Sequence, residues 1–186
     1  MIIIGITGTL GAGKGTVVEY LTREKGFLHF SVRNYLLEKI RNRGLEENRD
    51  SMFNIANSLR AQHGPSYVTD QLYLEALQLG KNCVIESIRT PGEVMSLREK
   101  GDFHLFAVDA DAKIRYQRIL IRQSETDRIS FETFLENEER EMTTDDPNKQ
   151  NIRECICLAD FVFYNNGSRE DLFFKVEEAL KHILKG

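Results

Sequence analysis

Proline is scarce in this chain, with three residues in 186, and neither a low-complexity segment nor an internal repeat interrupts it. Linkers between domains are usually rich in proline, glycine or serine. The length also lies within the usual range of one domain. We therefore expect residues 1–186 to form a single domain.

Cysteine is equally scarce. The three residues, Cys83, Cys155 and Cys157, make an odd number, and no Cys-x-x-Cys pair occurs. A disulfide framework or a zinc site normally uses another count and spacing. We expect small, buried, apolar side chains in a reducing compartment rather than functional thiols.

Long apolar runs and an excess of basic residues are absent as well. No segment approaches the roughly 20 apolar residues of a membrane-spanning helix, and residues 1–6 lack the basic start of a signal peptide. The pattern predicts a cytoplasmic protein without a membrane partner. With 25 Lys and Arg against 29 Asp and Glu, the chain is not expected to bind nucleic acid, although a local arginine cluster can still hold phosphate.

Short apolar runs alternate along the chain with longer amphipathic segments. The runs predict strands at 2–7, 27–30, 83–87, 103–108 and 161–164. The amphipathic segments predict helices at 15–25, 32–43, 51–63, 68–79, 91–100, 111–122, 130–142 and 168–184. Strands separated by helices are typical of parallel pairing with helices on both faces. The predicted fold class is a three-layer α/β domain.

The segment Gly8-Thr9-Leu10-Gly11-Ala12-Gly13-Lys14 fits the pattern G-x-x-x-x-G-K and lies between a predicted strand and a predicted helix. Glycines allow successive backbone N–H groups to curl around a phosphate, and the helix N-terminus adds positive partial charge. Lys14 would then neutralise the β- and γ-phosphates of ATP. The pattern predicts an ATP-binding cradle formed by Gly8, Gly11, Ala12, Gly13, Lys14, Gly15 and Thr16.

The general motif has serine or threonine directly after the lysine, whereas this chain has Gly15 and then Thr16. The string Gly-Ala-Gly-Lys-Gly-Thr resembles the loop of adenylate kinases and their relatives. That resemblance implies that the Thr16 hydroxyl lies beside the phosphates and Mg²⁺. It also implies a five-stranded parallel sheet in the order 2-3-1-4-5.

Two further segments resemble the acceptor side of nucleoside monophosphate kinases. The segment 31–37 resembles the start of their acceptor-binding helix, with Asn34 where the family has aspartate and Leu37 where it has arginine. The resemblance implies that Arg33, in the same segment, takes the place of that arginine in binding the acceptor. The segment 85–91 resembles the strand end that supplies an acidic residue and an arginine. The resemblance implies that Glu86 lies near the metal and Arg89 binds the acceptor phosphate, with acceptor-binding helices at about 31–80.

Arg115, Arg118 and Arg122 are spaced three and four residues apart and so share one face of the predicted helix. In the nucleoside monophosphate kinases that this chain resembles, a mobile lid follows such a helix. Arg122 and Arg128 bracket a polar segment, which predicts a short lid at about 122–130. Arginine suits this role because its planar guanidinium binds phosphate through two donors and stays charged. Arg118, Arg122 and Arg128 are therefore candidate catalytic residues together with Lys14 and Arg89.

A nearer resemblance is to adenylate-kinase-related and dephospho-CoA-kinase-like proteins of archaea and some bacteria. It rests on Arg60 with Gly64-Pro65, on segment 85–89, on charged segment 134–141 and on the segments 159–160 and 165–168. It implies a substrate-binding role for Arg60. It also implies that the loop after the last strand, with Asn165 and Gly167, borders the adenine.

The predicted reaction is transfer of the γ-phosphoryl group from Mg-ATP to a small nucleotide-like acceptor. A phosphate acceptor needs no general base, and Asn34 stands where a carboxylate for a hydroxyl acceptor is expected, so we favour a nucleoside monophosphate kinase. Two alternatives stay open. One is a dephospho-CoA kinase, and the other is a nucleotide-binding switch or assembly NTPase without a small acceptor. The sequence leaves the oligomeric state open.

Overall fold

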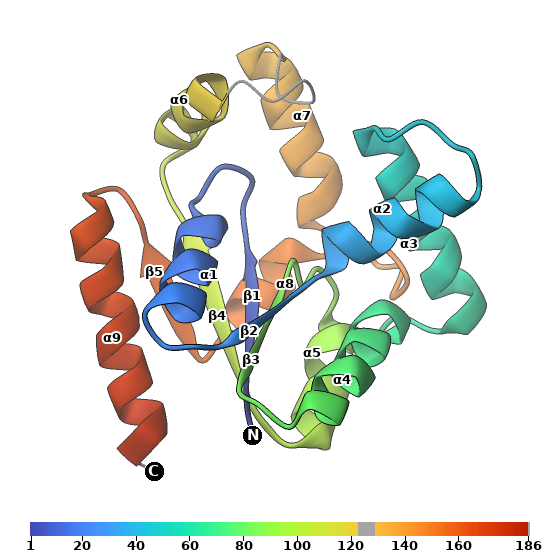
Figure 1. The fold of residues 1–186 in the computed structure, drawn as a ribbon. Helices are drawn as coiled ribbons and strands as arrows, with labels where there is room; N and C mark the ends of the chain where they lie inside the picture. Colours follow the sequence, from blue (N-terminus) through green and yellow to red (C-terminus); the bar gives the residue numbers. More distant parts are fainter. Residues whose placement is uncertain (123–128, 186) are drawn as a thin grey trace.

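The computed structural model describes residues 1–122 and 129–185. Within them, five strands form one parallel sheet in the order β2-β3-β1-β4-β5, which confirms the predicted topology (Figure 1). The strands are β1 (Ile2–Gly8), β2 (Leu28–Ser31), β3 (Cys83–Glu86), β4 (Asp102–Asp109) and β5 (Phe161–Tyr164). The helices are α1 (Lys14–Arg23), α2 (Val32–Asn42), α3 (Arg49–His63), α4 (Tyr67–Leu79), α5 (Pro91–Lys100), α6 (Ala112–Arg122), α7 (Phe131–Met142), α8 (Ile152–Cys157) and α9 (Arg169–Lys185).

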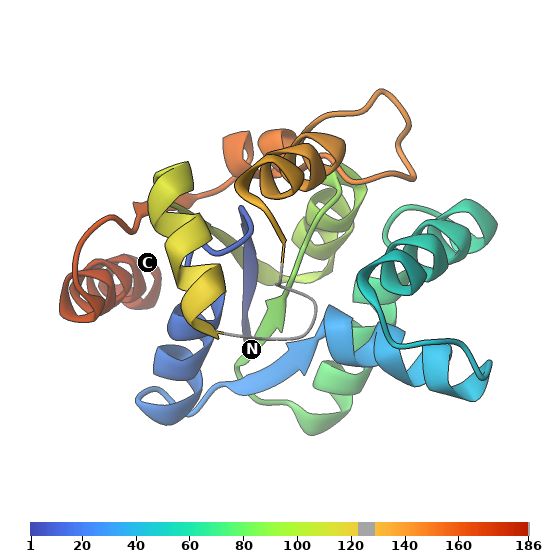
Figure 2. The same cartoon turned by 90° about the horizontal axis from the view of Figure 1, so that it is seen from above.

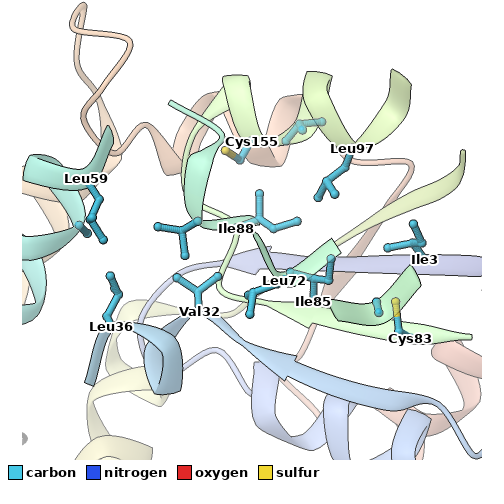
Figure 3. Close-up of a cluster of buried hydrophobic side chains, with 14 of the residues drawn as sticks. Ile3, Val32, Leu36, Leu59, Leu72, Cys83, Ile85, Ile88, Leu97 and Cys155 are labelled. Atoms are coloured by element: carbon cyan, nitrogen blue, oxygen red, sulfur yellow. The ribbon is translucent and has the colours of Figure 1, made fainter. Parts of the chain in front are cut away.

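The central strand β1 is buried on both faces of the sheet. Ile4 and Ile6 lie in the apolar cluster under α1 and α9. Ile3 points to the opposite face, where it joins Ile85 and residues of α2, α3, α4, α5 and α8 (Figure 3). Successive side chains of a strand alternate between faces, so a run of apolar residues in β1 fills both cores. The helices therefore cover both faces of the sheet, as predicted.

Helices α6 and α7 lie beyond the carboxyl ends of the strands (Figure 1). Seen from that edge, α6 in yellow, α7 in orange, and α2 and α3 in blue to teal stand around the strand ends (Figure 2). None of the helices in residues 1–122 and 129–185 is both long and apolar enough to span a bilayer. Ligands of parallel α/β sheets bind at this edge.

Two expectations from the sequence were wrong. The short helix α8 was not predicted, because six residues are too few to show a helical repeat, although Asn151 caps it by accepting a hydrogen bond from the N–H of Glu154 at 3.1 Å. Cys83 and Cys155 are buried as expected, but Cys157 is exposed.

A buried ion pair joins α3 to α5. Arg60 and Glu93 are 1% and 0% exposed, and Arg60 Nη2 lies 3.5 Å from Glu93 Oε1. The other oxygen of Glu93 accepts hydrogen bonds from the backbone N–H groups of Arg89 at 2.7 Å and Thr90 at 3.0 Å. One carboxylate therefore starts α5, orients the loop that carries Arg89 and neutralises an arginine of α3.

We expect Glu93→Ala to lower the free energy of unfolding by about 3–5 kcal/mol, because it leaves the charge of Arg60 buried without a partner. Glu99→Ala, at an exposed position of the same helix, should change it by less than about 0.5 kcal/mol. Urea denaturation of the two variants and the wild type measures the difference. Equal stability of the two variants would show that the buried pair contributes nothing.

Candidate functional site

The loop between β1 and α1 passes very close to its neighbours. Gly8 has φ +130°, and a Cβ placed on it would lie 1.9 Å from the carbonyl oxygen of Val108. Gly13, the N-cap of α1, has φ +105°, and its Cβ would lie 2.4 Å from Nδ2 of Asn165. A Cβ on Gly15, in contrast, would meet nothing within 4 Å. Gly8 and Gly13 are thus required by the backbone path, whereas Gly15 is not required by packing.

Lys14 folds back over this loop. Its Nζ donates hydrogen bonds to the carbonyl oxygens of Gly8 at 2.8 Å and Thr9 at 2.7 Å. Burial, followed by the charge of Arg89, lowers the pKa of Lys14 to about 7, while Glu86 and Glu141 act in the opposite direction. Burial and the neighbouring guanidinium thus disfavour the charged form of Lys14 in the free site, and an anion bound beside it would favour that form.

A cavity of about 560 Å³ lies beside the loop. It reaches from the start of α1 to α2 and α3 and is bordered by α6 and α7. The residues predicted from the sequence that line it are Gly11, Gly13, Lys14, Gly15, Thr16, Arg33, Arg60, Glu86, Arg89, Arg118 and Arg122. Arg128 and the rest of 123–128 lie outside the described residues, so the lid stays a prediction.

A smaller pocket of about 150 Å³ also borders the loop, and Gly13, Thr16 and Arg118 line it together with Asn165 and Gly167. Asn165 is buried, and its Nδ2 donates to the carbonyl oxygen of Ala12 at 2.7 Å. The segment after β5 is thereby tied directly to the cradle.

The arginines of α6 divide into two kinds. Arg115 is buried, and its guanidinium donates to the carbonyl oxygens of Ala110 at 2.7 Å and Leu10 at 3.2 Å and pairs with Glu138 of α7. Arg118 and Arg122 line the cavity. Nη1 of Arg118 also donates to the carbonyl oxygen of Ala12 at 3.5 Å. Arg115 thus supports the loop from a buried position, while Arg118 contacts the loop and lines the cavity.

Glu86 and Thr16 are the residues predicted to lie near a metal. Burial raises the pKa of Glu86, but the hydrogen bond from His29 at 3.1 Å and the charges of Lys14 and Arg89 outweigh it and hold that pKa below its usual value. Within residues 1–122 and 129–185, no group of three or more His, Cys, Asp or Glu side chains is arranged to hold a metal. Mg²⁺ commonly binds through one or two protein ligands plus substrate phosphates and water, and an ionised Glu86 with the Thr16 hydroxyl fits that donor set.

Several cavity residues were assigned no role from the sequence. Glu141 accepts hydrogen bonds from Arg49 and Arg89, each at 2.6 Å, and Arg89 also donates to Gln150 at 2.7 Å. Burial raises the pKa of Glu141, but the charges of Arg89 and Arg49 outweigh it and hold that pKa below its usual value. A signal was present, because Glu141 shares a helix face with the buried Phe134 seven residues earlier.

The half of the cavity next to α2 and α3 is partly apolar. Its lining there includes Val32, Leu36, Met52, Phe53 and Ala56. Arg33, an exposed residue near the start of α2, lines the same region. The cavity thus combines an apolar wall with cationic groups, which suits a ligand that carries both a ring system and an anionic group.

The sheet order, the glycine-rich loop before α1 and the cavity at the strand ends define a P-loop kinase-like fold. The chain belongs to the family described as AAA domain, whose model matches residues 4–144, and to the UPF0200 proteins.

A UPF0200 protein of Methanocaldococcus jannaschii is 31% identical over 187 residues, which cover 99% of this chain and 91% of that protein. The solved structure of TT1252 from Thermus thermophilus is 25% identical with a TM-score of 0.61, and the match covers 99% of this chain and 96% of that one. The shikimate kinase from Bacteroides thetaiotaomicron, at 15% identity and a TM-score of 0.55 over 100% of this chain and 99% of that one, shares the fold.

The low pKa of Lys14 gives a prediction for nucleoside triphosphate binding. The free site holds this pKa at about 7, so the amine is mostly neutral at pH 8, whereas bound phosphates favour the ammonium form. Binding of a non-hydrolysable ATP analogue at pH 8 should therefore take up about one proton, and affinity should fall as pH rises above 7. Calorimetry in two buffers of different ionisation enthalpy measures the uptake.

Lys14→Arg is the control for this measurement, since a guanidinium stays charged at both pH values. The variant should bind without proton uptake. An equal uptake in variant and wild type would assign the proton to another group.

Proposed function

We propose that this protein is an ATP-dependent phosphotransferase that acts on a small nucleotide-like acceptor. The observation that carries the proposal is that one cavity joins the cradle residues Lys14 and Thr16 to Arg89 and the partly apolar wall of α2 and α3. A donor and an acceptor can therefore meet inside a single cavity. The P-loop kinase-like fold supports the same class of reaction.

In this proposal the cradle binds ATP, with the adenine against Asn165 and Gly167. Lys14, Arg118 and Arg122 neutralise the negative charge of the transferring group, which is where most of the catalysis of phosphoryl transfer arises. Thr16 and Glu86 are the residues that would hold Mg²⁺, which would offset the charge of the phosphates. Arg89 holds the acceptor so that its nucleophilic oxygen is aligned with the γ-phosphorus.

The acceptor that fits best is a nucleoside monophosphate. The apolar side chains of Met52 and Phe53 offer a surface for a base, and Arg33 and Arg89 offer charges for its phosphate. A phosphate oxygen is already a nucleophile near neutral pH and needs no general base. A hydroxyl acceptor would need one, and Asn34 stands where that carboxylate is expected. Arg60 is nearly fully buried against Glu93 and lines the same cavity.

Glu141 is the observation that favours a second candidate, a kinase for a hydroxyl acceptor such as dephospho-CoA. Its carboxylate lies on the acceptor side of the cavity, where a general base for a hydroxyl group is needed. Two arginines nevertheless hold this carboxylate in its charged form, which makes it a weak base. We therefore place this candidate second.

Incubation with Mg-ATP and a panel of AMP, the common deoxynucleoside monophosphates and dephospho-CoA, with ADP release as readout, tests the proposal. A nucleoside monophosphate should stimulate ADP release and be recovered as the diphosphate. Stimulation by dephospho-CoA alone would favour the second candidate. ADP release independent of every acceptor would instead indicate a nucleotide-binding switch or assembly NTPase.

Lys14→Ala should lower phosphotransfer by about 10²–10³-fold, because it removes charge stabilisation at the transferring phosphoryl group. Lys113→Ala, an exposed position on α6, is the matched control and should leave the rate unchanged. Circular dichroism verifies that both variants fold. Turnover of Lys14→Ala near that of the wild type would remove Lys14 from the reaction.

Arg89→Ala should raise the acceptor KM or lower kcat by about tenfold or more, because it deletes charge-assisted hydrogen bonds to the acceptor. The Kd for ATP should change far less. Arg153→Ala, at an exposed position in α8, is the control. A collapse of ATP affinity with unchanged acceptor kinetics would place Arg89 in the donor site.

A further inference from the structure

One carboxylate lies between two arginines that line the acceptor side of the cavity. Glu141 Oε1 accepts from Nη2 of Arg49, the first residue of α3, and Glu141 Oε2 accepts from Nη1 of Arg89, which follows β3. Both distances are 2.6 Å. Each oxygen thus binds a guanidinium from a different element, while Glu141 itself comes from the last turn of α7.

The arginines around Glu141 carry more N–H donors than the neighbouring acceptor atoms bind. A guanidinium carries five N–H groups, and within the described part of the chain Nε of Arg49 is buried without a hydrogen-bond partner. The same is true of Nε of Arg60, whose side chain is 1% exposed and lines the same cavity. Buried donors without partners are unfavourable, so the cluster favours an additional or a larger anion.

The contacts of the Glu141 carboxylate are of the kind that a phosphate monoester could also make. Two oxygens of one anion face two guanidinium groups at the short distances typical of charge-assisted hydrogen bonds. A phosphate group offers three such oxygens and up to two negative charges. It could therefore contact both arginines and still reach a donor that Glu141 leaves unpaired.

We propose that Glu141 occupies the phosphate-monoester subsite of the acceptor, and that the incoming acceptor must displace this side chain from Arg49 and Arg89. The inference rests on the proposed function, in which the Arg89 side of the cavity takes the acceptor. Glu141 is then a specificity-determining residue. A weakly charged ligand cannot compete with a carboxylate fixed at that position, whereas a dianionic phosphate can.

The alternative is that Glu141 only anchors the end of α7. The two roles predict opposite effects on ligand affinity. If the contact is purely structural, removing the carboxylate lowers stability and leaves anion affinity unchanged or weaker. If Glu141 occupies the subsite, removing it frees two arginines, and a phosphate anion binds more tightly than in the wild type.

The probe is inorganic phosphate, titrated calorimetrically into the full chain at constant ionic strength adjusted with chloride. The variants are Glu141→Gln, which keeps the volume but removes the charge, and Glu141→Ala, which empties the position. Glu139→Gln, exposed on the same helix, is the matched control. The double variant Arg89→Ala/Glu141→Gln reports whether any gain in phosphate affinity arises at Arg89.

We expect phosphate to bind Glu141→Gln about tenfold more tightly than the wild type. The reason is that phosphate no longer has to displace a charge-assisted hydrogen bond, which contributes a free energy of that order. Glu139→Gln should show no gain, and the double variant should lose it. Phosphate should also raise the Tm of both Glu141 variants by more than it raises that of the wild type. Because the increase in Tm is measured for each variant relative to its own phosphate-free Tm, the test also works if the Glu141 variants are less stable than the wild type.

Unchanged or weaker phosphate affinity in both Glu141 variants would overturn the inference, as would a gain that survives in the double variant. The measurement needs neither ATP nor transfer. Failure of the proposed function would instead appear as acceptor-independent ADP release in wild-type protein, so the two failures are distinguishable.

Discussion

The parallel pairing of β1 with β3 on one side and β4 on the other is the interaction on which the site depends. The register sets Ile6 opposite Glu86 and Gly8 opposite Val108. The cradle therefore begins at the level where β3 delivers its carboxylate, and Glu86 and Arg89 reach the same cavity. A shift of one residue in the pairing of β3 with β1 would turn Glu86 to the opposite face of the sheet.

Carboxylates position several of the cationic groups in and around the cavity. Glu93 holds Arg60 and the loop of Arg89, Glu138 holds Arg115, and Glu141 joins Arg49 to Arg89. A chain with a net charge of −4 can thus hold a cluster of arginines around one cavity. The pairs reduce repulsion among like charges in the free protein, although each pairing must also offset the desolvation of both partners.

The sequence predicted those parts of the molecule that local patterns determine. The strands, the loop from Gly8 to Thr16 and most helices follow from apolar periodicity and from glycines with special backbone angles. The resemblance added the sheet order. The contact of Glu141 with Arg49 joins residues 92 positions apart, so no local pattern indicates it. The burial of Arg60 could likewise not be predicted from the local sequence, because its partner Glu93 lies on another helix.

The contact between Asn165 and the cradle restricts how the chain can diverge. The amide of Asn165 fills the space that a side chain at position 13 would need, and it also binds the carbonyl of Ala12. A residue larger than glycine at position 13 would therefore require both a left-handed backbone and a smaller residue at position 165. Loss of Asn165 in turn would leave a buried carbonyl without its donor. The two positions are consequently expected to vary together among relatives, although 152 positions of sequence separate them.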